Sequence, residues 1–181
     1  MNRHLRLLLL AAVLLPLDAN AAEPPGSRTP GSGTSGSPAG SAVEFLGKGE
    51  QIYTCAVTLG AATSGGAAWK LKAPEATLLD ASGHVVGRHF AGPTWQASDG
   101  SKVVGTPLIA SASPDPGAIT WLVLRATAHD GAGLFASVAY IARTRTVGGV
   151  APATGCDGSH QGAEIRVPYS ATYTFFKPVA P

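Results

Sequence analysis

Charged side chains are scarce in this sequence. They make up 13% of its 181 residues, about half of the usual share of about 25%. The 13 basic residues nearly balance the 11 acidic ones, and Lys70/Lys72 and Arg143/Arg145 form only short alternating pairs. A protein that binds nucleic acid needs a clustered basic face to offset the phosphate charge. We therefore expect no nucleic-acid partner.

Helical patterning and the short motifs of common enzyme classes are also missing. Beyond the N-terminal apolar run, no segment repeats its apolar residues with the 3.6-residue period of a helix. The sequence has no Gly-x-Ser-x-Gly, no Cys-x-x-Cys, and no Gly-x-Gly-x-x-Gly between a strand and a helix. The absence of these motifs favours a non-catalytic protein over an enzyme, and we expect no cofactor.

An export signal occupies residues 1–21. Arg3 and Arg6 precede an apolar run over residues 7–17, and Ala19-Asn20-Ala21 follows as a small-x-small cleavage site. This order is typical of a secretory signal peptide, and the run is too short to span a bilayer as a helix. We expect a secreted or periplasmic protein that keeps no transmembrane segment. Its mature chain should begin at Ala22 or Glu23, and the intact mass of the exported protein would show this start.

Two further regions follow the signal. Residues 22–41 are rich in Gly, Ser, Pro and Thr, a composition typical of a flexible leader. Residues 42–178 are expected to form a single β domain, monomeric, because apolar alternation with period two recurs between turn signals. Two such turns are Asp80–Gly83 and Ser98–Ser101, each with a glycine in a hairpin position.

The alternation is clearest at both ends of this domain. Residues 51–59 place Tyr53, Cys55 and Val57 on one face, and residues 164–176 do the same with Tyr169, Ala171, Tyr173 and Phe175. A long strand is also predicted over residues 134–144. Eight to ten short strands in about 140 residues predict an all-β fold, an antiparallel β-sandwich or flattened barrel.

The sequence has two cysteines, Cys55 and Cys156. In an exported chain such a pair favours a disulfide bond. It would join a strand near the start of the domain to a loop near its end. Metal ligation and a reactive thiol are the alternatives.

Several short motifs, in order along residues 42–177, resemble those of one secreted family. They are Gln51-Ile-Tyr-Thr-Cys55, Gly92-Pro-Thr-Trp95, Asp99-Gly-Ser101, Trp121-Leu-Val-Leu124, Thr146-Val-Gly-Gly-Val-Ala-Pro152, Gly155-Cys-Asp157 and Val167-Pro-Tyr169. The family is DUF3455, a domain of unknown function. The resemblance therefore implies a secreted domain and no particular activity.

The segment from Gly83 to Gly105 gathers the residue types best suited to a site. It holds His89, Trp95 and Asp99. Of the three tryptophans, Trp95 is the best placed to lie at the surface, because it follows Gly92-Pro93 beside a hairpin. Arg143, predicted to share a strand face with Arg145, could hold a carboxylate or phosphate with two parallel hydrogen bonds. We take His89, Trp95, Asp99 and Arg143 as candidate ligand-binding residues, with none assigned as catalytic or as a metal ligand.

Two functional hypotheses fit this pattern. The first is an exported, non-catalytic envelope or extracellular module that binds a glycan or a small polar ligand. The alternative is a periplasmic or secreted metalloprotein or hydrolase that uses His89 and Asp99, because histidine and carboxylate serve both metal binding and acid–base chemistry.

Overall fold

The structure is a computed structural model that describes residues 40–58 and 66–178. The chain divides into two units, residues 1–36 and 37–181, and every described residue belongs to the second. The predicted signal peptide and nearly all of the predicted leader thus lie outside the described residues. The described ranges contain no helix with the length and apolarity that crossing a bilayer requires.

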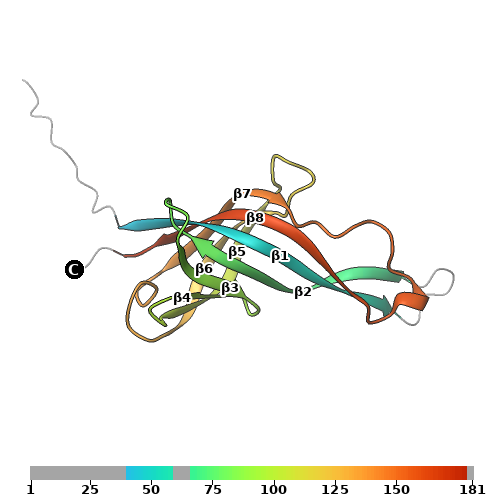
Figure 1. Ribbon diagram of the computed structural model, residues 1–181, viewed down its shortest axis with the longest axis horizontal. Coiled ribbons are helices and arrows are strands. Elements are labelled where there is room, and N and C mark those ends of the chain that lie inside the picture. The colour runs from blue at the N-terminus through green and yellow to red at the C-terminus, as the bar shows by residue number, and fades with distance from the viewer. Residues whose placement is uncertain (1–39, 59–65, 179–181) are drawn as a thin grey trace, which may run out of the picture. The chain divides into compact units, whose positions relative to one another are not determined.

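Eight antiparallel strands form a single closed sheet, in which each strand pairs with its neighbour in sequence and the last pairs with the first. The all-β prediction is therefore confirmed, with one ring of eight strands (Figure 1). The strands are β1 (Ala42–Thr58), β2 (Gly66–Leu79), β3 (Val85–Phe90), β4 (Thr94–Ala97), β5 (Lys102–Ser111), β6 (Trp121–Asp130), β7 (Tyr140–Gly148) and β8 (Glu164–Phe176). One short 3-10 turn, η1 (Gly158–His160), precedes β8.

Three of the strands are longer than the ring requires. Residues 51–58 of β1 pair with residues 66–74 of β2 on one side, and residues 51–54 of β1 pair with residues 164–167 of β8 on the other. We call these three segments the arm. Figure 1 shows β1, β2 and β8 continuing side by side beyond the shorter strands. Because β3 pairs with β2 only as far as Ala76, the arm leaves the ring next to the β3–β4 hairpin.

Alternation puts large apolar side chains inside the ring. The predicted inner face of β8 is confirmed, since Tyr169, Ala171, Tyr173 and Phe175 are all buried. They pack in a core with Phe45, Leu78, Trp95, Val103, Leu124 and Ile141. Gly47 leaves room for Tyr173, because a Cβ there would lie 2.5 Å from its ring. An eight-stranded barrel encloses a space that side chains fill or that holds one small ligand.

One end of the ring is filled by the loop between β6 and β7. Phe135 and Val138 are fully buried, and the Phe135 ring stacks on Phe175 with centroids 4.4 Å apart. Asp99 and Ser101, in and after the β4–β5 turn, hold this loop in place. The Asp99 carboxylate accepts from the Leu134 N–H at 2.7 Å, and the Ser101 hydroxyl accepts from the Phe135 N–H at 3.1 Å.

Two sequence predictions about β7 are wrong. The predicted strand over residues 134–144 begins only at Tyr140, because the backbone N–H groups of Leu134 and Phe135 bond to side chains of the β4–β5 turn rather than to a neighbouring strand. Arg143 and Arg145 do not share a face. A bulge follows Thr144, and Arg145 has a left-handed backbone with φ of 47°. The bulge turns Arg145 outward, where it pairs with Glu44, whereas Arg143 lies opposite the inward-facing Tyr173.

Candidate functional site

A pocket of about 280 Å³ lies at the end of the ring opposite Phe135, beside the base of the arm. We call it the barrel pocket. Its volume is close to the lower bound of about 300 Å³ for small-molecule sites. The apolar part of its wall comprises Leu71, Pro74, Pro93, Pro107, Leu122 and Leu124, and the polar and aromatic part comprises Gln51, His89, Trp95, Thr120, Arg143 and Tyr173.

His89 and Trp95 face each other on β3 and β4 and form one wall of the pocket. Their rings stack in parallel with centroids 4.3 Å apart, and the Tyr173 ring meets each of them edge-on. Both are almost completely buried, with 3% and 1% of their surface exposed. The ranking of Trp95 as the tryptophan best placed for the surface is therefore wrong, because it is the most buried of the three. The stack on His89 and the contacts with Tyr173 and Phe175 hold the indole inside the ring.

His89 is neutral in this site. Its pKa is lowered to about 4, mainly by burial away from water; the bond to the Thr94 backbone opposes this shift, and the Arg143 cation adds to it. Nδ1 lies 2.9 Å from the Thr94 carbonyl oxygen. Since a carbonyl only accepts, Nδ1 carries the proton and Nε2 keeps the lone pair. His89 therefore adds an aromatic surface and one acceptor to the pocket, and no charge at neutral pH.

Two other polar side chains of the pocket have unmet hydrogen bonds. The Gln51 amide nitrogen and the Trp95 indole nitrogen are buried and have no partner among the described residues. Leaving a buried donor unpaired costs about 1–3 kcal/mol. Such groups inside a fold are uncommon and call for an explanation, of which a ligand is one.

Arg143 is the only charged residue in the wall of the barrel pocket, as far as the described residues show. It is half-buried, and its Nε and Nη2 donate to the Thr120 carbonyl at 3.1 and 2.8 Å. Within the described ranges it forms no ion pair. Its positive charge also lowers the pKa values of Tyr53, Tyr169 and Tyr173, although burial raises all three overall.

A second hollow of about 270 Å³ continues from the barrel pocket and shares Gln51, Leu71, Thr120 and Arg143 with it. Its wall includes Tyr53, whose hydroxyl donates to the Gly149 carbonyl at 2.6 Å. Gly149 has φ of 85°, and a Cβ there would lie 2.8 Å from the Tyr169 side chain. A glycine is therefore needed for the chain after β7 to approach β1 and β8 so closely.

Asp99 lies apart from the other three candidate residues. It is in the exposed β4–β5 turn and does not line the barrel pocket. Its carboxylate accepts from the Ser101 hydroxyl at 2.6 Å, and hydrogen bonds from Ser101 and the Leu134 N–H lower its pKa. Asp99 thus orders the loop that fills the opposite end of the ring, and the structure does not bring it together with His89.

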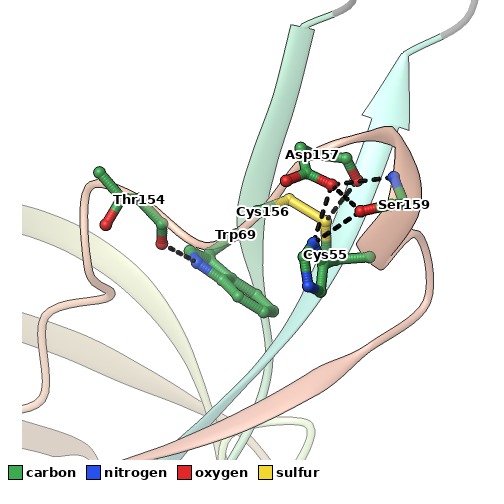
Figure 2. Close-up of polar contacts among 7 residues, drawn as sticks. Cys55, Trp69, Thr154, Cys156, Asp157 and Ser159 are labelled. Atoms are coloured by element: carbon green, nitrogen blue, oxygen red, sulfur yellow. Dashed lines mark hydrogen bonds and ion pairs between the residues drawn. A yellow bond between two sulfur atoms is a disulfide. The ribbon is translucent and has the colours of Figure 1, made fainter.

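Cys55 and Cys156 form a disulfide bond, as predicted, between β1 in the arm and the loop that precedes β8 (Figure 2). In the same loop the Thr154 carbonyl accepts from the Trp69 indole N–H at 3.0 Å. The Cys55 N–H donates to the Ala163 carbonyl at 2.8 Å, and its carbonyl accepts from Gly162 at 2.9 Å. Together these contacts attach residues 154–163 to the arm.

A serine, a histidine and an aspartate meet beside the disulfide. Asp157 Oδ1 accepts from the Ser159 hydroxyl at 2.6 Å and from His160 Nδ1 at 2.8 Å, and these bonds lower the Asp157 pKa to about 2 (Figure 2 shows Asp157 and Ser159). In a catalytic triad the serine donates to the imidazole, which then removes its proton. Here the hydroxyl donates directly to the carboxylate. The cluster caps η1 and does not activate a nucleophile.

Another hollow, of about 470 Å³, lies on the outer side of β1, β2 and β3. Most of its charged groups are already bonded: Arg166 binds both Glu50 and Glu75, and Arg88 donates to Gln96. It therefore offers few unmet interactions to a ligand. Within residues 40–58 and 66–178, no three His, Cys, Asp or Glu side chains gather in a way that could hold a metal ion.

The protein is therefore an antiparallel eight-stranded barrel, and the wall of its barrel pocket is partly apolar and partly polar. The model of one family, described as a protein of unknown function (DUF3455), matches residues 37–177. This match covers most of the chain, so the chain belongs to the DUF3455 family, as its motifs suggest. No curated protein and no solved structure matches it.

Gln51 and Tyr173 line the pocket but were not among the residues predicted from the sequence. The alternation of the sequence does indicate that Gln51 faces inward. Two positions before Tyr53 on the same strand, period-two alternation puts this polar side chain on the inner face. For Tyr173, the alternation along residues 164–176 correctly predicts an inward side chain but gives no sign that it lines a pocket.

Proposed function

We propose that this protein is an exported, non-catalytic binding module that holds one small ligand in the barrel pocket. The observation that carries the proposal is the coincidence, in one pocket, of buried donors without partners and an arginine without a carboxylate. The apolar wall supplies the area that stabilises a small molecule, and the few polar groups fix its orientation. Export rests on the N-terminal signal pattern, and the disulfide bond is compatible with it.

A small ligand fits the pocket better than a glycan laid across exposed aromatic rings. Trp95 is buried, and Trp69 and Trp121 are half-buried. Trp69 also has its indole N–H bonded to Thr154. The three tryptophans therefore offer no open aromatic platform. The alternative enzyme or metalloprotein needs His89 and Asp99 to act together, and they lie in different parts of the fold.

A fragment panel tests the pocket directly. Leu71 is 56% exposed and lines both hollows, so Leu71→Trp should narrow the opening at little cost to folding. We expect at least one small amphipathic fragment to bind the wild type by calorimetry and to bind Leu71→Trp at least tenfold more weakly, a loss of about 1.4 kcal/mol.

The matched control is Val85→Trp. Val85 is 63% exposed and lines neither hollow, so this variant should bind the fragments as the wild type does. If no fragment binds, or if both tryptophan variants weaken binding equally, the pocket is not the site.

A further inference from the structure

We propose that the ligand of the barrel pocket is a small monocarboxylate with an apolar body, whose carboxylate is bound by Arg143. This inference rests on the proposed function, because it names the ligand class for the same pocket. Three features of the pocket lead to it: the kind of hydrogen bond left unmet, the number of charges, and the apolar character of the remaining wall.

The fully buried pocket atoms that lack a hydrogen-bond partner, on Gln51 and Trp95, are both donors. The Trp95 indole nitrogen and the Arg143 guanidinium have no acceptor capacity. The Gln51 amide nitrogen, which is also a donor, lies in a side chain that is only 1% exposed. Arg143 uses Nε and Nη2 to bind the Thr120 carbonyl, and it forms no ion pair with a described residue. A ligand that satisfies these groups must present acceptors, and a carboxylate presents two oxygens in one plane, the geometry that arginine binds best.

The charge count favours a single negative charge. Arg143 is the one cation in the described wall, and no acidic residue there neutralises it. His89 remains uncharged at neutral pH because burial keeps its pKa near 4. A half-buried charge without a counter-ion is costly, and a bound anion removes that cost. A second negative charge on the ligand would meet no cation and would lose its own hydration.

The rest of the wall favours an apolar body. Three prolines and three leucines line the pocket beside the stacked rings of His89 and Trp95. The prolines and leucines have no side-chain group that could form a hydrogen bond to a second polar end of the ligand. A short alkyl chain or one aromatic ring fits both this surface and a volume of about 280 Å³.

Matched probes separate the charge from the shape. Calorimetry would compare butanoate, hexanoate, octanoate and benzoate with the corresponding primary alcohols, and hexanoate with the dicarboxylate adipate. We expect the best acid to bind wild type at least tenfold more tightly than its alcohol, and adipate to bind more weakly than hexanoate. Charge-assisted hydrogen bonds are strong enough to give this ratio.

Arg143→Gln should reduce the ratio of acid to alcohol affinity to less than about threefold, while the affinity for the alcohol stays within about threefold of wild type. Arg143→Lys keeps the charge without the planar fork and should give an intermediate ratio. The matched control is Arg145→Gln, the same change on the outer face of the same strand, where the arginine pairs with Glu44. It should leave the ratio unchanged.

Two failures are distinguishable. If acids and alcohols bind wild type equally, or if the ratio survives in Arg143→Gln, Arg143 only positions Thr120; the carboxylate assignment is then wrong, and the binding pocket stands. If neither acids nor alcohols show binding that Leu71→Trp weakens, the proposed function fails, and the ligand class fails with it.

Discussion

Replacing Cys55 or Cys156 with alanine should lower the free energy of unfolding by about 2–5 kcal/mol. The disulfide joins residues 101 apart in sequence. In the chain-entropy model, closing a loop of about 100 residues is worth about 4.7 kcal/mol, because it restricts the unfolded chain. The loss can be measured by urea unfolding followed through tryptophan fluorescence.

The double variant is the control for this prediction. It should lose little more than either single variant, because the same bond is missing in all three. Circular dichroism of the reduced protein should still show strands, since the ring closes through β1–β8 hydrogen bonds and not through the disulfide. Two single losses that differ strongly and add in the double variant would mean that each cysteine acts by itself.

Lowering the pH from about 6.5 to about 4 should destabilise the protein by about 3 kcal/mol through His89 alone. The pKa of His89 is about 4 in the folded protein, held down mainly by burial, and about 6.5 in the unfolded chain. Between these values the unfolded chain binds the extra proton. Stability is therefore complete above pH 6.5 and falls by about 1.4 kcal/mol for each unit below it.

Urea unfolding at several pH values between 4.5 and 7 tests this. His89→Gln should be less stable than wild type at pH 7 but should show little pH dependence over this range. The control is His84→Gln, at an exposed histidine beside Asp80, and this variant should still lose stability as the pH falls. The hydrogen-bonded Asp157 has a pKa of about 2, so its contribution is lost only below about pH 4 and does not overlap. A wild-type slope that persists in His89→Gln would refute the neutral, buried histidine.

Local patterns in the sequence predict much of this fold. Period-two alternation identifies the inner face of β8, and the cysteine count identifies the disulfide. The closure of β8 onto β1 is not visible in the sequence, because the pairing joins residues that are more than a hundred positions apart. The true start of β7 is hidden as well, because it depends on hydrogen bonds that Asp99 and Ser101 make from a distant turn.

The candidate site was predicted in part. His89, Trp95 and Arg143 do line one pocket, whereas Asp99 does not. The bulge after Thr144 separates Arg143 from Arg145, and simple alternation cannot anticipate a single residue with left-handed backbone. The Gly-Pro turn before Trp95 favours the surface more than the surroundings of the other two tryptophans do, but His89 and Tyr173 enclose its ring.

The most direct test of the ligand pocket is a ¹H–¹⁵N spectrum of the protein titrated with the tightest-binding carboxylate of the panel. Trp95 lines the pocket with its indole N–H unpaired, whereas Trp69 lies in the arm with its indole N–H bonded to Thr154. We expect the Trp95 indole and Gln51 amide signals to shift as the carboxylate binds, and the Trp69 signal to stay in place. Binding that shifts Trp69 and leaves Trp95 and Gln51 unmoved would contradict this expectation.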